Sequence, residues 1–205
     1  MLEHFFSILT NFIIGIISTL GYPGVLLLMA LQTMAIPIPS EVILPFAGYL
    51  AFTGRFNIFL IALFGAIGSC IGSSVAYYLG YKGGRPLVEK YGKYVLISRN
   101  DLDLSERFFL KNQAWAVFLG QHVPVVRSFL GLVGGMAKAP YKKFAAYVFT
   151  GSFIWSYILA YAGMKLGANW NSLHEKFRGF DTVIVAVIIF GVIFWAWRHW
   201  KNRVR

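Results

Sequence analysis

Two prolines and an acid interrupt a long apolar stretch near the start of the chain. From Phe5 to Thr53, Glu41 is the only formally charged residue, and it follows Pro37 and Pro39 closely. Proline removes a backbone amide donor and opposes helix continuation. A charge in an apolar stretch needs protein or water to satisfy it. The chain must therefore fold so that a broken helix and a carboxylate meet inside protein or a watery cavity.

The composition indicates an integral membrane protein. Hydrophobic residues make up 58% of the chain and charged residues 13%, against roughly 25% charged in soluble domains. Four or five segments of about 20 residues fill the whole length, so we expect a single all-α membrane domain, residues 1–205. The net charge of +11 gathers at the ends of apolar segments, which favours lipid headgroups over nucleic acid. The single cysteine, Cys70, is interpreted as a small packing residue.

Two apolar stretches are broken in the middle. Residues 24–36 and 40–52 form two arms of roughly 13 residues, about 20 Å each as helices, too short for a hydrocarbon core of about 30 Å. The stretch 115–137 is interrupted by four residues, Gln121, His122, Pro124 and Arg127. Each broken stretch therefore predicts a re-entrant helical hairpin.

The remaining apolar segments predict spanning helices. They cover residues 57–81, 144–163 and 182–197, with a tilted first span over residues 5–20 that has no signal-peptide pattern and is expected to be retained. Gly65, Gly68 and Gly72 provide small faces for helix packing. Residues 82–111 carry seven basic and four acidic side chains and are predicted to contain an amphipathic surface helix.

The distribution of lysine and arginine predicts the orientation. If both hairpins return to their own side, residues 82–111, 138–143 and 198–205 share one side and carry seven, three and four basic residues, fourteen in all. The other side holds four, Arg55, Lys165, Lys176 and Arg178. The positive-inside rule then predicts that both termini are cytoplasmic.

The chain also shows an internal repeat. A shift of 83 positions pairs seven identical residues, Gly68 with Gly151, Ser69 with Ser152, Ser73 with Ser156, Tyr78 with Tyr161, Gly80 with Gly163, Lys82 with Lys165 and Gly84 with Gly167. A shift of 86 pairs Glu41 with Arg127 and Gly48 with Gly134. Each copy, residues 35–84 and 120–167, would be one hairpin plus one span, so the copies would be inverted, as in many transporters.

The candidate site lies where the two hairpins would meet. Arg127 is a planar cation suited to phosphate oxygens, and Glu41 would neutralise it or take up a proton. His122 is a candidate proton relay or phosphate donor. Pro39 and Pro124 break the backbone and free its polar groups for an anion. A purely structural ion pair between Glu41 and Arg127 is the alternative.

These motifs resemble the DedA family of membrane proteins. The resemblance rests on Pro37 to Glu41 with Pro45 and Gly48, on residues 68–84, and on residues 120–127 with Gly135. It implies two opposed re-entrant hairpins in a bacterial cytoplasmic membrane and the transport of lipids such as undecaprenyl phosphate. By position, Glu41 matches the family's acid after the paired prolines, and Arg127 matches the second arginine of its arginine-proline-arginine segment.

Three positions depart from the family pattern. Gln32 stands where many members have glutamate, Ser73 where many have aspartate, and Gln121 where the first arginine is expected. Loss of both an acid at position 32 and a base at position 121 would remove a buried ion pair without stranding either charge. We therefore place Gln32 and Gln121 among the candidate substrate-binding residues.

The predicted function is the transport of a phosphate-bearing lipid, with undecaprenyl phosphate the first choice. A transporter of phosphatidylethanolamine or another phospholipid is the alternative within the same class. A membrane-bound lipid phosphatase and a structural assembly factor are the alternatives from other classes. Since no metal-ligand spacing, phosphate loop or nucleophile triad is found, neither a cofactor nor enzyme activity is predicted.

Overall fold

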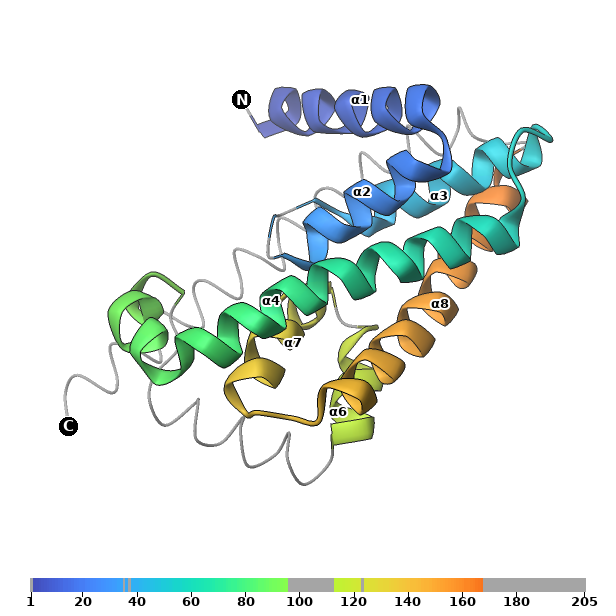
Figure 1. The fold of residues 1–205 in the computed structure, drawn as a ribbon. Coiled ribbons are helices and arrows are strands. Elements are labelled where there is room, and N and C mark those ends of the chain that lie inside the picture. Colours follow the sequence, from blue (N-terminus) through green and yellow to red (C-terminus); the bar gives the residue numbers. More distant parts are fainter. Residues whose placement is uncertain (1, 35, 37, 96–112, 123, 168–205) are drawn as a thin grey trace. The chain divides into compact units, whose positions relative to one another are not determined.

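The computed structural model describes residues 2–34, 36, 38–95, 113–122 and 124–167, and every regular element among them is an α-helix. The helices are α1 (Leu2–Leu20), α2 (Tyr22–Thr33), α3 (Ser40–Phe52), α4 (Ile58–Val95), α6 (Gln113–Gly120), α7 (Pro124–Met136) and α8 (Tyr141–Lys165) (Figure 1). The expected last span over residues 182–197 and the surface helix predicted after residue 100 lie outside the described residues. The contacts reported below lie within residues 1–165, which form one unit.

Two of these helices are long and apolar enough to cross a membrane, Ile58–Gly83 within α4 and Tyr141–Lys165, which is α8. They match the two spans predicted over residues 57–81 and 144–163. Helical backbone continues past the expected end of the first span to Val95. The prediction of an all-helical membrane protein is thus confirmed in its element types.

The first broken stretch forms two short helices joined at the prolines. α2 has 12 residues and α3 has 13, so each is about 18–20 Å long. Gly21, with a φ of 68°, makes the turn into α2, and Pro39 is the N-cap of α3. The second broken stretch gives α6 and α7, which are separated at residues 121–123.

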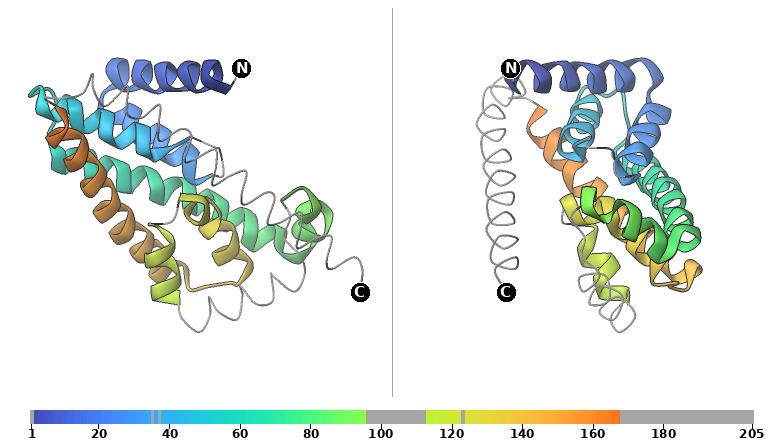
Figure 2. Two further views of the ribbon diagram at one scale, coloured as in Figure 1. Left: turned by 180° about the vertical axis from the view of Figure 1, so that it is seen from behind. Right: turned by 90° about the vertical axis from the view of Figure 1, so that its left-hand side faces the viewer.

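Each pair of short helices divides its packing between the two long helices. α2 and α7 pack on α4, whereas α3 and α6 pack on α8, and α4 also crosses α8 directly. Figure 1 and the rear view in Figure 2 show the short helices on the same long pair. One arm of each pair therefore lies against the long helix of its own half of the chain, and the second arm lies against that of the other half.

Glycines allow these helices to approach each other at backbone distance. Four approaches of a glycine to a carbonyl group form two matched pairs: Gly48 to Ala160 with Gly135 to Tyr77, and Gly163 to Pro45 with Gly80 to Leu132. In both pairs the long-helix residues are 83 apart in number and the short-helix residues 87 apart. The contacts thus reproduce the shift of 83 found in the sequence and adjust the hairpin shift from 86 to 87.

The predicted role of Gly65, Gly68 and Gly72 in packing is confirmed. A side chain at Gly68 or Gly72 would clash with carbonyl groups of α2, and one at Gly65 would meet the Ser156 hydroxyl at 2.8 Å. These glycines therefore allow α4 to contact the backbone of α2 and the Ser156 side chain of α8.

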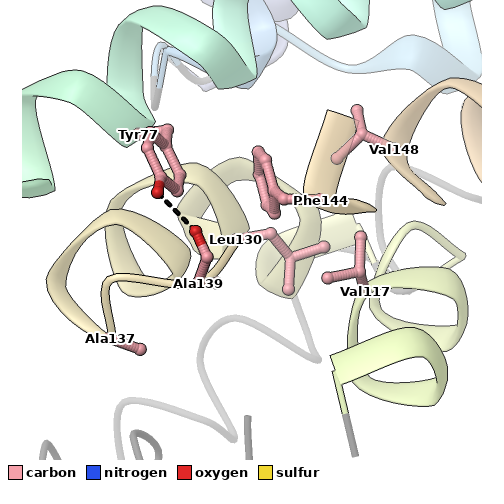
Figure 3. Close-up of a cluster of buried hydrophobic side chains, with 7 residues drawn as sticks. All are labelled: Tyr77, Val117, Leu130, Ala137, Ala139, Phe144 and Val148. Atoms are coloured by element: carbon pink, nitrogen blue, oxygen red, sulfur yellow. Dashed lines mark hydrogen bonds between the residues drawn. The ribbon is translucent and has the colours of Figure 1, made fainter. Parts of the chain in front are cut away.

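A buried apolar cluster fixes α6 and α7 against the long helices. It consists of Tyr77, Val117, Leu130, Ala137, Ala139, Phe144 and Val148 (Figure 3). The Tyr77 hydroxyl donates a hydrogen bond to the Ala139 carbonyl, which ties α4 to the segment between α7 and α8. Because close packing gains dispersion energy in lipid as well as in water, the cluster holds Val117 of α6 and Leu130 of α7 against the long helices.

Candidate anion-binding site

Arg127 lies in the first turn of α7 and is completely buried. Its Nη1 donates a hydrogen bond of 3.0 Å to the Ser40 hydroxyl, the first residue of α3. This bond joins residues 87 positions apart, the same shift that relates the glycine contacts. The two second arms, α3 and α7, therefore begin at one place inside the protein.

The Arg127 guanidinium has hydrogen-bonding capacity left. Its Nε and Nη2 are buried and have no hydrogen-bond partner among the described residues. A buried charged donor is strongly disfavoured unless an acceptor satisfies it. Two donors held in one plane, side by side, suit two oxygens of a carboxylate or phosphate group.

The N-terminus of α3 adds positive electrostatic potential beside this guanidinium. The first backbone hydrogen bond of α3 runs from the Val42 N–H to the Pro39 carbonyl at 3.2 Å. The N–H groups of Ser40 and Glu41 thus have no helical partner. Such free N–H groups and the helix dipole attract an anion, and so does the positively charged guanidinium of Arg127. A negatively charged group is therefore favoured between the N-terminus of α3 and Arg127.

Glu41 is the acid that the structure brings near Arg127. It lies in the first turn of α3, is half-buried, and interacts electrostatically with the guanidinium. Its Oε1 is buried without a hydrogen-bond partner among the described residues. No ion pair within 4.0 Å joins these two described side chains, so the carboxylate tempers the charge of Arg127 without occupying its donors.

Gln32 lies in the last turn of α2, and Gln121 directly follows α6. Both are buried, Gln121 completely. Gln121 accepts a hydrogen bond of 3.0 Å from the Ser152 hydroxyl, while Thr33, next to Gln32, donates to the carbonyl of Ser69. Ser69 and Ser152 are related by the shift of 83. The Gln121 Nε2 and the Gln32 Oε1 have no partner among the described residues.

His122 packs at the end of α6. Its Nδ1–H donates to the Phe118 carbonyl at 2.8 Å, and its ring meets the Trp155 ring edge-on at 5.6 Å. The His122 ring also lies 5.2 Å from the Phe118 ring, so one hydrogen bond and two aromatic contacts fix its position. No hydrogen bond connects His122 with Arg127 or Glu41 in the part of the chain that the structure describes.

Sequence reasoning gave no role in the site to the serine hydroxyl groups, although Ser73 was noted as a departure from the family pattern. Ser40 was not predicted as a site residue, because serine is common at the start of a helix. Four further buried polar atoms have no hydrogen-bond partner among the described residues: Ser69 Oγ, Ser73 Oγ, Ser156 Oγ and Trp155 Nε1. The repeat pairs Ser69 with Ser152 and Ser73 with Ser156, and it was the available signal for these four serines.

The suggested relation between Gln32 and Gln121 remains a prediction, since no hydrogen bond joins them in the structure. We expect Gln32→Glu and Gln121→Arg each to lower the free energy of unfolding by about 3 kcal/mol, because each buries an unpaired charge. The double variant should recover at least about 1 kcal/mol of the summed loss. A double-mutant cycle on thermal unfolding measures this coupling, and equal damage from all three variants would rule out the pairing.

The fold and the buried guanidinium define an α-helical membrane protein with a polar site between two pairs of broken helices. A sequence profile of the VTT domain matches residues 38–165. The chain belongs to this family, the VTT domain or DedA family. The match runs from the residue before Pro39 to the last residue of α8, so it includes both Glu41 and Arg127.

Three relatives illustrate what the chain is similar to. Undecaprenyl phosphate transporter A of Bacillus subtilis is 33% identical over 180 residues, 87% of this chain and 89% of the relative. The Staphylococcus aureus protein of the same name is 27% identical over 203 residues, 97% and 98% of the two chains. A Lactococcus lactis protein named alkaline phosphatase-like protein is 30% identical over 187 residues, 89% and 86%. No solved structure matches the chain.

Proposed function

We propose that this protein transports a phosphate-bearing lipid across the bacterial cytoplasmic membrane, with undecaprenyl phosphate as the substrate. The observation that carries the proposal is the buried Arg127, whose Nη1 is held by Ser40 and whose Nε and Nη2 have no partner within the described part of the chain. A phosphate headgroup supplies the acceptors that these donors lack. The names of the Bacillus and Staphylococcus relatives support the polyprenyl phosphate as the lipid.

In this proposal the two pairs of broken helices are re-entrant hairpins that enter from opposite faces. α2 and α3 are each too short to span a core of about 30 Å, and their junction reaches Arg127 through Ser40. Residues 82–111 and 138–143 would face the cytoplasm. The headgroup would then cross by way of the site between the hairpins while its apolar tail stays in the bilayer.

Glu41 is proposed to couple this transport to protons. Its Oε1 receives no hydrogen bond from any described residue. In the proposal the carboxylate takes up a proton as the anionic headgroup arrives, which keeps the net charge of the site low. The glutamine at position 32 and the glutamine at position 121 leave few other ionisable groups beside it. His122 is the second candidate, although its contacts are with Phe118 and Trp155.

A lipid phosphatase is the competing function, which the name of the Lactococcus relative favours. Such an enzyme needs a nucleophile activated by a nearby base. Ser40 lies closest to Arg127, yet its hydroxyl accepts from the guanidinium, and no base bonds to it among the described residues. The geometry therefore supports binding of phosphate rather than its cleavage.

Reconstituted vesicles separate these functions. We expect the protein to speed the transbilayer movement of a fluorescent polyprenyl phosphate at least about tenfold over empty vesicles, with no release of inorganic phosphate. Faster movement of phosphatidylethanolamine than of polyprenyl phosphate would establish the other substrate class, and phosphate release would establish the phosphatase.

The same assay at pH 6 and pH 8 tests the proposed role of Glu41 in proton coupling. Glu41→Gln should remove the pH dependence of lipid transfer; full pH dependence in that variant would refute the coupling.

A further inference from the structure

The first helix differs in its pattern from α2 and α3, the two short helices that it contacts. In α1, polar residues recur at the spacing of one helical face, at positions 3, 7, 11 and 18 with position 10 beside them. α2 and α3 have no such stripe and carry apolar residues on all sides. Ile14 is the one apolar residue within this stripe. A helix with a largely polar face suits a boundary between water and apolar surroundings rather than the interior of a bilayer.

The exposure of its side chains divides α1 into three faces. Ile13 and Ile17 are completely buried and form the face packed on the protein. Ile8 and Phe12 are each 57% exposed and form an apolar outer face. Asn11 is also exposed, and at 3.6 residues per turn it lies beside Phe12 on the side away from Ile13. The helix thus presents one face to protein, one apolar face and one polar face to its surroundings.

α1 lies across the ends of α2 and α3 instead of alongside a spanning helix. Among the pairs of helices in substantial contact, α1 contacts α2 and α3 alone, and both views in Figure 2 show it crossing above them. Its last turn is tied to the segment between α3 and α4, because Arg55 Nη2 donates to the Ser18 carbonyl at 2.6 Å. The Asn57 N–H donates to the Tyr22 hydroxyl at 2.6 Å in the same region.

From this arrangement we infer that α1 is an interfacial helix that binds the lipid surface on the side that carries Arg55. Ile8 and Phe12 point toward the acyl chains, and Asn11 points toward headgroups and water. As a span, α1 would place the Asn11 amide in hydrocarbon, and no hydrogen bond joins that amide to another described residue. An unpaired amide in hydrocarbon is strongly disfavoured.

The inference changes the topology predicted from the sequence at one point. If α1 does not cross the membrane, the N-terminus lies on the Arg55 side rather than in the cytoplasm. Residues 1–54 contain no lysine or arginine, so the count of fourteen basic residues against four is unchanged. The orientation of every other segment therefore stays as predicted, and the two termini lie on opposite sides of the membrane.

Site-specific labelling tests this placement independently of transport. In a Cys70→Ser background, since Cys70 is the only cysteine, single variants Asn11→Cys, Phe12→Cys, Arg55→Cys, Ile71→Cys and Lys142→Cys are treated with a membrane-impermeant maleimide. The reagent is added to right-side-out and to inverted vesicles. We expect Asn11→Cys to react from the same side as Arg55→Cys and at least tenfold faster than Ile71→Cys, which lies on the exposed apolar face of α4.

Comparison of Phe12→Cys with Asn11→Cys distinguishes an interfacial α1 from a spanning α1. On an interfacial helix, Phe12→Cys faces the acyl chains and should react several-fold more slowly than Asn11→Cys. On a spanning helix both positions lie at the same depth and should be as unreactive as Ile71→Cys. That outcome, or cleavage of an N-terminal protease tag from the Lys142 side, would overturn the inference, whereas cleavage from the Arg55 side would support it.

Discussion

Replacing Arg127 with lysine should lower lipid transfer by about tenfold to a hundredfold, although the positive charge is kept. The guanidinium uses Nη1 for Ser40, and its buried Nε and Nη2 have no partner among the residues that the structure describes. Lysine supplies one nitrogen and cannot hold Ser40 and two oxygens of a headgroup in the same plane. A charge-assisted hydrogen bond contributes about 1.5–3 kcal/mol, and about 1.4 kcal/mol corresponds to a tenfold change.

The chain offers a matched control for this variant. Arg55 is exposed, and it donates to the Ser18 carbonyl in α1, away from the candidate site. Arg55→Lys should therefore leave the rate of lipid transfer within about twofold of the parent rate. The measurement is the initial rate of polyprenyl phosphate movement in vesicles with equal amounts of folded protein. If Arg127→Lys transported at the parent rate, the guanidinium would not bind the headgroup, and its role would be structural.

The charged part of the site was predictable because charges are rare in this sequence. Glu41 and Arg127 are conspicuous in apolar stretches, and the family pattern points to the same two residues. What the sequence does not reveal is how they meet. A shift of 86 pairs Glu41 with Arg127, whereas the structure follows a shift of 87 and joins Arg127 to Ser40. A difference of one residue changes the bonded partner from a carboxylate to a hydroxyl group.

The two short helices of the first broken stretch were predictable from its length and its prolines, and with 12 and 13 residues neither is long enough to cross a bilayer. Their exchange of partners was not predictable, because sequence spacing indicates that glycines pack closely but not against which helix. Apolar content alone also favoured a span for α1. The burial of Ile13 and Ile17 and the exposure of Asn11 are tertiary facts, and they led us to infer an interfacial helix.

Adding a methyl group at Gly48 or Gly135 should destabilise the protein by about 1–3 kcal/mol, the usual cost of overpacking a tight contact. A Cβ at Gly48 would clash with the carbonyl of Ala160, and one at Gly135 with that of Tyr77. The two substitutions act at corresponding places in the two halves, where α3 meets α8 and α7 meets α4. We therefore expect Gly48→Ala and Gly135→Ala to lower the thermal unfolding midpoint in detergent by similar amounts.

Gly15 is the matched control, because a Cβ there meets nothing within 4 Å. Gly15→Ala should leave the midpoint unchanged or raise it, since alanine favours a helix over glycine by about 1 kcal/mol. Because the atom that Gly48 approaches is a backbone oxygen, the double variant Gly48→Ala with Ala160→Gly should be no more stable than Gly48→Ala. Rescue by Ala160→Gly would mean that side chains, not backbones, limit the distance between α3 and α8. In that case the contact between α3 and α8 would tolerate larger residues, and close backbone approach at the glycines would not be what holds the site together.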